Sequence, residues 1–277
     1  MWWGLVCALV AAIAYGVASV LQAVAARAVD DDGAAGVDPR LLFRVLRQWR
    51  YVLGLSMDAL GFIAQLVALR VLPLFVVQAA LAASLAVTAV AALKIGARLH
   101  GREWTAIVAV CAGLALLGAS AQSEGSEPVG LGFHIALAVA TVVLAGVGAL
   151  AGRAADTVRG PALGLVAGLG FALVALAGRV LDTSSVVAVL TDPATYTIAG
   201  AGVVAMLFYA SALQRGSVTT ATALMVVGET VLPSVIGVVA LGDSTRPGFA
   251  PIAIAGFVLA VAAALALARF GEIEPAS

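Results

Sequence analysis

The chain alternates between long apolar runs and short polar or charged connections. A helix needs about 20 apolar residues to cross the hydrocarbon of a bilayer, whereas a strand of a membrane barrel needs about ten and alternates apolar with polar positions. The runs are too long for barrel strands and do not alternate, so they predict helices. We therefore expect an all-α polytopic membrane protein with about nine transmembrane helices. The predicted spans are 3–26, 50–70, 73–93, 103–121, 130–151, 160–180, 195–214, 217–241 and 249–270.

Composition agrees with this expectation. Of the 277 residues, 63% are hydrophobic and 11% are charged, and the mean hydropathy is +1.12. Average soluble proteins have about 45–50% apolar and about 25% charged residues, so a soluble domain could not cover its surface with so few charges. The formal net charge is zero and no block of basic residues occurs, so no nucleic-acid partner is expected.

The basic residues predict an orientation. If the spans cross the membrane in succession, twelve of the fifteen Lys and Arg residues fall in connections on one side and three on the other. Basic residues concentrate in cytoplasmic connections, which predicts an external N-terminus and a cytoplasmic C-terminus. The abundance of Ala, Val, Leu and Gly, with Arg preferred over Lys, suggests a GC-rich bacterial genome and hence the bacterial inner membrane.

The longest connection contains an amphipathic segment, 38–49. Asp38 and Pro39 can begin a helix there, with leucines on one face and arginines on another. We expect this helix to lie in the membrane interface as a topological anchor, with a lipid or partner sensor as the alternative.

The chain also repeats its own layout. Segments 68–96 and 212–242 each have a span ending in Ala-Leu, a very short turn, and a long span closing on glycine. Counting the connections gives the two copies opposite directions across the membrane, as in the inverted repeats of secondary transporters. The expected organisation is a first repeat of four spans, an external loop, a second repeat of five spans and a short cytoplasmic tail, at 1–121, 122–129, 130–271 and 272–277.

Three motifs carry a family resemblance: AYGVASVLQAVAAR at 14–27, ALRVLP at 68–73 and GETVLPSVIGVVALGD at 228–243. With these, the chain resembles the drug/metabolite transporter superfamily of the EamA type, whose typical members have five plus five spans. Only segment 38–49 occupies the slot of a second helix here, and this nine-span layout is similar to NIPA-type magnesium-transporter-like proteins. The resemblance implies an inverted-repeat bundle of four plus five spans, a transport activity, and a cavity lined by the helix that contains Pro233.

Two carboxyl groups are predicted at membrane depth, where ionisable residues are costly and usually functional. Asp58 shares one helical face with Gly61 and Gln65. Glu229 lies four residues before Pro233, which has no N–H to bond the Glu229 carbonyl, so a carboxylate and an unpaired carbonyl lie at one level. Burial disfavours the ionised form of a carboxyl group, so we expect Asp58 or Glu229 to exchange protons.

Other polar residues within spans allow two interpretations. Gln22, Gln65 and Gln78 can line a polar cavity or bond across helices. Arg179 and Asp182 are three residues apart near the end of a span, which predicts a surface ion pair between them. Small residues at four-residue spacing favour close helix packing, within the bundle or at a dimer seam. They include Gly148/Gly152, Gly164/Gly168, Ala109/Gly113 and the ladder from Gly256 to Ala268.

Several chemistries lack their motifs. The sequence has no GxxxxGK[ST], HExxH or GxSxG, and its two cysteines are too few for a cysteine metal cluster. We therefore expect neither an ATP-driven pump nor an enzyme, and no cofactor.

The leading hypothesis is a secondary transporter that moves a small metabolite or drug-like solute by alternating access, with proton coupling at Asp58 and Glu229. The predicted pathway residues are Asp58, Glu229, Gln65, Gln22, Gln78 and Pro233. The alternatives are a transporter of Mg²⁺ or another divalent cation, a membrane scaffold without transport, and a lipid-carrier flippase. The expected partners are a small molecule or ion and the lipid bilayer. A homodimer, a metal site, the substrate and the direction of transport stay open.

Overall fold

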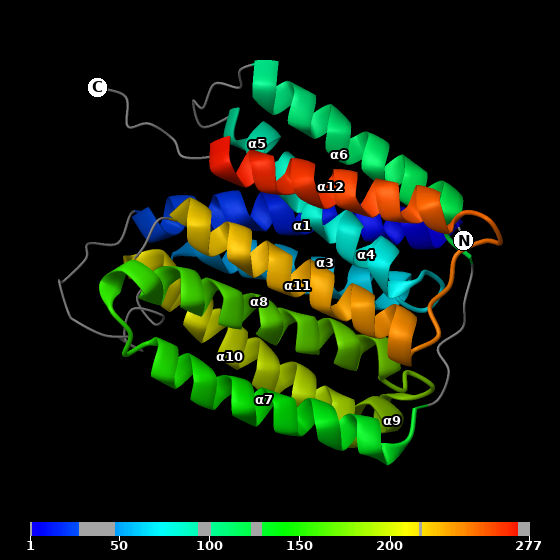
Figure 1. Cartoon of the computed structure of the whole chain (residues 1–277). Helices are drawn as coiled ribbons and strands as arrows, with labels where there is room; N and C mark the ends of the chain where they lie inside the picture. Colours follow the sequence, from blue (N-terminus) through cyan, green and yellow to red (C-terminus); the bar gives the residue numbers. More distant parts are fainter. Residues whose placement is uncertain (1, 28–47, 94–100, 123–128, 216–217, 271–277) are drawn as a thin grey trace.

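A computed structural model describes residues 2–27, 48–93, 101–122, 129–215 and 218–270 (Figure 1). The elements in these ranges are helices that lie approximately side by side, with α6 and α12 along one edge of the bundle and α7 along the other. The helices are α1 (Trp2–Arg27), α3 (Trp49–Ala68), α4 (Leu74–Ala82), α5 (Ser84–Ala92), α6 (Gly101–Ser120), α7 (Leu131–Ala151), α8 (Asp156–Val180), α9 (Val186–Thr191), α10 (Pro193–Arg215), α11 (Val218–Ala240) and α12 (Ala250–Phe270).

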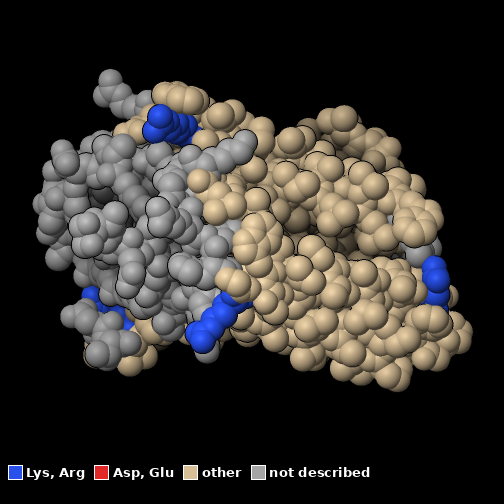
Figure 2. All heavy atoms as spheres, turned by 90° about the horizontal axis from the view of Figure 1, so that it is seen from above, with Lys and Arg blue, Asp and Glu red and all other residues tan. Residues whose placement is uncertain are grey.

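The described helices have the length and apolarity of membrane spans. Six are long and apolar enough to cross a bilayer: α1, α3, the α4–α5 segment, α7, α8 and α10. Shorter apolar stretches occur in α6, α11 and α12. On the face that Figure 2 draws, Lys and Arg side chains are few and no Asp or Glu is visible, so most of its described surface is uncharged. A surface of this kind suits contact with lipid, so the chain is a helical membrane protein.

Each predicted span coincides with helix, but the span predicted at 73–93 is not one continuous helix. It is interrupted at Ala83, whose N–H bonds to the carbonyls of Ala79 and Ala80 before α5 begins. Beyond the interruption α1 comes very close, because Gly16 has no side chain and the Ser84 carbonyl oxygen lies 2.7 Å from where its Cβ would be. The Thr88 hydroxyl donates to the Ser84 carbonyl at 2.9 Å and to that of Gly16 at 3.3 Å.

Two connections between the predicted spans can also be compared with the structure. The short helix α9 was not predicted; the Ser185 side chain caps it by accepting from the Ala188 N–H at 3.0 Å. The predicted amphipathic segment 38–49 lies outside the described residues except for its last two positions, where α3 begins.

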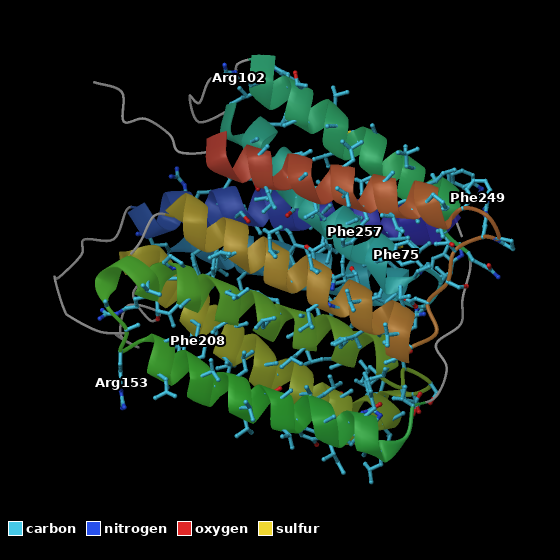
Figure 3. The ribbon with its side chains drawn as sticks, viewed as in Figure 1. Phe75, Arg102, Arg153, Phe208, Phe249 and Phe257 are labelled. Atoms are coloured by element: carbon cyan, nitrogen blue, oxygen red, sulfur yellow. The ribbon has the colours of Figure 1, made fainter. Side chains whose placement is uncertain are left out.

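Small residues let several helices touch at their backbones. A Cβ on Gly113 of α6 would lie 2.7 Å from the Gly256 carbonyl oxygen of α12. Gly148 of α7 accommodates the Phe208 ring of α10 (Figure 3), and Gly168 of α8 packs against the Met225 carbonyl of α11. These predicted small-residue positions therefore pack inside one chain, as expected for helices in lipid.

Gly168→Ala is expected to lower the free energy of unfolding by about 1–3 kcal/mol, because the added methyl group would overlap the Met225 carbonyl oxygen and push α8 from α11. Thermal unfolding in detergent measures the change. The matched control is Gly146→Ala in α7, where a Cβ meets nothing within 4 Å. Equal melting temperatures for the two variants would contradict the packing described here.

Candidate functional site

A buried ion pair lies at the end of the bundle where α3 turns into α4. The Arg179 Nη2 atom of α8 lies 3.0 Å from the Asp243 Oδ1 atom in the connection after α11, and the two side chains are 3% and 0% exposed. Charges removed from water are stabilised only when their remaining hydrogen-bonding capacity is used. The surrounding main chain provides those partners.

The ion pair binds the main chain of the α3–α4 turn. Arg179 Nη1 donates to the carbonyl oxygens of Leu69 and Leu72, and Asp243 Oδ2 accepts from the Leu74 N–H. Helix ends leave such carbonyl and N–H groups without intrahelical partners, and here each charge meets the helix end that suits its sign. We call Arg179, Asp243 and these main-chain groups of Leu69, Leu72 and Leu74 the turn clamp.

The predicted pairing of Arg179 with Asp182 is therefore wrong. Helix α8 ends at Val180, and Leu181 is extended with φ −59° and ψ 128°, so Asp182 no longer follows the helical spacing on which the prediction relied. Asp182 is exposed, and its Oδ1 accepts from the Ser184 N–H at 2.8 Å. This hydrogen bond is the main reason that the pKa of Asp182 lies below its usual value.

Further contacts join the same end of the bundle. The Arg246 N–H donates to the Ser120 carbonyl at 3.0 Å, and Ala121 forms an isolated β-bridge with Thr245. Arg70, between α3 and α4, donates from Nη2 to the Gly178 carbonyl at 3.3 Å. Burial, and then the neighbouring Arg179 charge, lower the pKa of Arg70. The connection after α11 thus ties α4, α6 and α8 together.

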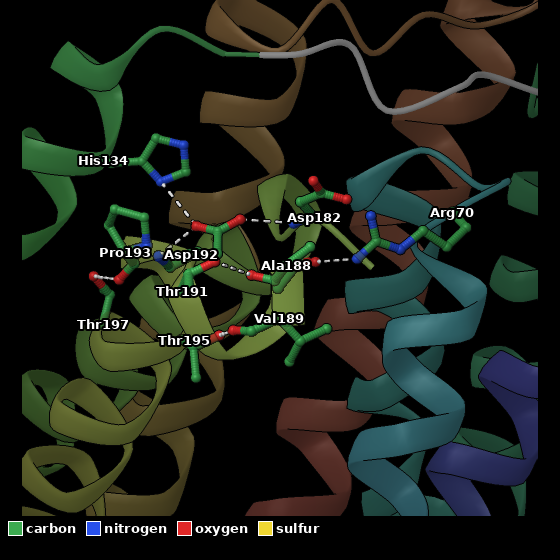
Figure 4. Close-up of polar contacts among 12 residues, drawn as sticks. Arg70, His134, Asp182, Ala188, Val189, Thr191, Asp192, Pro193, Thr195 and Thr197 are labelled. Atoms are coloured by element: carbon green, nitrogen blue, oxygen red, sulfur yellow. Dashed lines mark hydrogen bonds and ion pairs between the residues drawn. The ribbon is translucent and has the colours of Figure 1, made fainter. Parts of the chain in front are cut away.

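Asp192 organises the neighbouring connection (Figure 4). Its carboxylate accepts from the N–H groups of Asp182 at 2.7 Å and Ala194 at 2.8 Å, and lies 3.7 Å from Nδ1 of His134 on α7. Asp192 thereby caps the start of α10, where Pro193 occupies the first helical position. The contacts of His134 are thus with this connection rather than with the carboxyl groups predicted at membrane depth.

Within the bundle, the predicted face of α3 packs against Tyr15 of α1. The Tyr15 hydroxyl donates to Gln65 Oε1 at 2.9 Å, and a Cβ on Gly61 would lie 3.2 Å from the Tyr15 ring. Gln65 therefore bonds across helices, which was one of the two interpretations left open by its sequence. Sequence reasoning missed Tyr15, although it lies in the motif at 14–27.

The two predicted carboxyl groups lie on different helices. Asp58 of α3 and Glu229 of α11 are both partly buried, and both lie within electrostatic range of the Tyr15 phenol. They come from opposite halves of the sequence. Tyr15 therefore bonds to Gln65 and is influenced by one carboxyl group from each half of the chain.

Gln78 and Pro233 lie between this region and the turn clamp. Near the clamp, Leu74 touches Gly237, whose Cβ position is 3.0 Å from the Leu74 Cβ. Gln78 is one helical turn further into the bundle along α4, and Pro233 is one turn further along α11. Gln78 is 0% exposed, and within the described part of the chain neither of its amide atoms has a hydrogen-bond partner.

The remaining predicted groups add no metal centre. The side chain of Gln22 lies outside the described residues. Among the side chains that the structure does describe, no group of three or more His, Cys, Asp or Glu residues could hold a metal ion.

Comparison with known proteins finds no matching family model, no matching curated protein and no matching solved structure.

Tyr15→Phe and Gln65→Leu are expected to be coupled, because each change leaves the other partner's polar group buried without its hydrogen bond. A double-mutant cycle measured by thermal or denaturant unfolding should give a coupling free energy of about 0.6–1.7 kcal/mol, the range for such bonds in membranes.

The matched control for this cycle is Thr141→Val. The Thr141 hydroxyl donates to the Leu137 carbonyl of its own helix at 2.9 Å, and its change should be additive with Gln65→Leu. Additivity of Tyr15→Phe with Gln65→Leu would show that the described hydrogen bond does not contribute to stability.

Proposed function

We propose that the protein is a secondary transporter that moves a small organic solute across the membrane by alternating access. The observation that carries this proposal is the presence of two partly buried carboxyl groups within the bundle, Asp58 and Glu229, which come from different halves of the chain and lie within electrostatic range of Tyr15. Ionisable groups inside a membrane are costly unless they serve a pathway or pair with one another. Carboxyl groups from both halves of the chain suit a solute site that lies between two halves moving relative to one another.

The proposal includes the topology expected from sequence. Nine spans, arranged as inverted repeats of four and five, would place the N-terminus outside and the C-terminus in the cytoplasm of a bacterial inner membrane. Helices at all nine predicted ranges support this layout, and so does the resemblance to the drug/metabolite transporter superfamily. Inverted repeats bind their solute near the membrane midplane, where interrupted helices are common. The interruption at Ala83 between α4 and α5 suits such a site.

The side chains within the bundle suggest how the protein would bind the solute and transfer a proton. Asp58 and Glu229 would take up and release a proton, since a buried carboxyl group is more easily neutralised than an exposed one. The Gln78 amide would donate to and accept from a polar group of the solute, because a buried amide without partners is unfavourable. Tyr15 and Gln65 would hold α1 and α3 together around these groups.

Uptake into reconstituted vesicles tests the proposal. Vesicles containing a pH-sensitive dye would be offered amino acids, sugars, nucleosides, organic cations and Mg²⁺ in turn, with and without a proton gradient. We expect one organic class to enter with proton movement. Asp58→Asn and Glu229→Gln should each slow that uptake at least about ten-fold and weaken its dependence on pH, because they remove the titrating groups.

Asp182→Asn is the matched control, because it neutralises an exposed carboxyl group at the end of the bundle. It should leave uptake unchanged. Flux of Mg²⁺ instead of an organic solute would replace the proposal with a divalent-cation pathway. Uptake that neither Asp58→Asn nor Glu229→Gln changes would remove both carboxyl groups from the mechanism.

A further inference from the structure

We propose that the turn clamp is a gate, which closes the solute pathway at the α3–α4 end of the bundle and opens by separating Arg179 from Asp243. This inference depends on the transport function proposed above and names the device that controls access to its site. It is drawn from contacts that join the first half of the chain to the second.

The clamp closes one end of the bundle above the polar groups. Leu69, Leu72 and Leu74 of the α3–α4 turn are fully buried, and the side chains of Arg179 and Asp243 lie against them from the other half of the chain. On its far side, α4 is sealed by apolar packing. Phe75 of α4 belongs to the same apolar cluster as Phe257 of α12 (Figure 3). Gln78 lies one turn below this seal, so a solute that reached it from this end would have to pass the clamp.

The chemistry of the clamp suits reversible opening. Each of its contacts joins a charge to another charge or to a main-chain group. Water can replace every one of these partners, so the groups would be hydrated rather than left unpaired when the end opened.

Helix α4 has the form of a moving element. It has nine residues, and Asp243 holds its first N–H group at Leu74. At its other end the helix is interrupted at Ala83, where the Ala83 N–H bonds to both Ala79 and Ala80. Interruptions of this kind within helices often mark hinges. Release of Leu74 from Asp243 would allow α4 to tilt about Ala83 while α5 stays packed on α1 through Thr88.

Side-specific thiol labelling tests the gate without any solute. In a background with Cys7→Ala and Cys111→Ala, the Ser234→Cys variant places a reporter on α11, at a side chain that is 5% exposed. A membrane-impermeant methanethiosulfonate reagent is added to intact cells. Arg179→Gln, and separately Asp243→Asn, should raise the labelling rate at least about ten-fold. Arg153→Gln, an exposed arginine on another part of the bundle, should not.

A second reporter separates gating from general loosening. Ala201→Cys lies on α10, a helix that contributes no residue to the clamp, and is fully buried. Its labelling should not change in the Arg179→Gln and Asp243→Asn backgrounds. Equal acceleration at both reporters, or no acceleration at Ser234→Cys, would overturn the gate even if solute uptake is observed. Selective acceleration without uptake of any solute would instead leave the gate in place and reject the transport function.

A reversible cross-link gives a further test. Cysteines replacing Leu74 and Gly237 have Cβ positions 3.0 Å apart, shorter than the about 3.5–4.5 Å of relaxed disulfides, so the helices must shift slightly to form the bond. Because a Cβ at position 237 would also lie 2.5 Å from Asp243 Oδ2, uptake by the reduced variant is measured first as the reference. Their oxidation should abolish uptake of the solute identified above, and reduction should restore it. Cysteines replacing Gly170 and Ala205 join α8 to α10 at a similar 2.9 Å, within the second half, and should leave uptake intact. Unchanged uptake with Leu74 linked to Gly237 would show that this end need not open.

Discussion

The α3–α4 turn depends on the ion pair between Arg179 and Asp243. A tight turn placed among packed helices would leave carbonyl and N–H groups in an apolar environment, where each unpaired group is unfavourable. The guanidinium and the carboxylate satisfy those groups on opposite sides of the turn, and each neutralises the other. The turn can therefore be buried only because residues more than a hundred positions later in the sequence reach it.

The rest of the bundle is held by close contact rather than by polar bonds. Alanine and glycine make up much of the buried surface, and glycines at the α6–α12 and α8–α11 crossings bring two backbones together. Lipid provides no hydrophobic force between helices, so such contact and a few hydrogen bonds must provide the stability. The Tyr15–Gln65 bond between α1 and α3 is one of these.

The polar groups at the clamp and the polar groups that we assign to the solute lie at different depths in the bundle. At the clamp, the polar groups satisfy one another and close the end of the bundle. Deeper in the bundle, Gln78 is buried with an amide that no described group satisfies, on the helix that is interrupted at Ala83. A protein with a purely structural interior would be more stable with an apolar side chain at position 78. The groups that add least to stability are therefore the ones we assign to the solute.

The sequence by itself determined the helices. Run length and periodicity are local properties, so all nine predicted ranges coincide with helix, and Gly61 and Gln65 lie on the predicted face of α3. Only the tertiary structure decided the partners. The pairing of Arg179 with Asp182 seemed favourable from spacing, but the helix ends between them and Asp243 arrives from another connection. Likewise, Tyr15 becomes significant only once α1 and α3 pack together, because which side chains meet across helices depends on packing that no local pattern records.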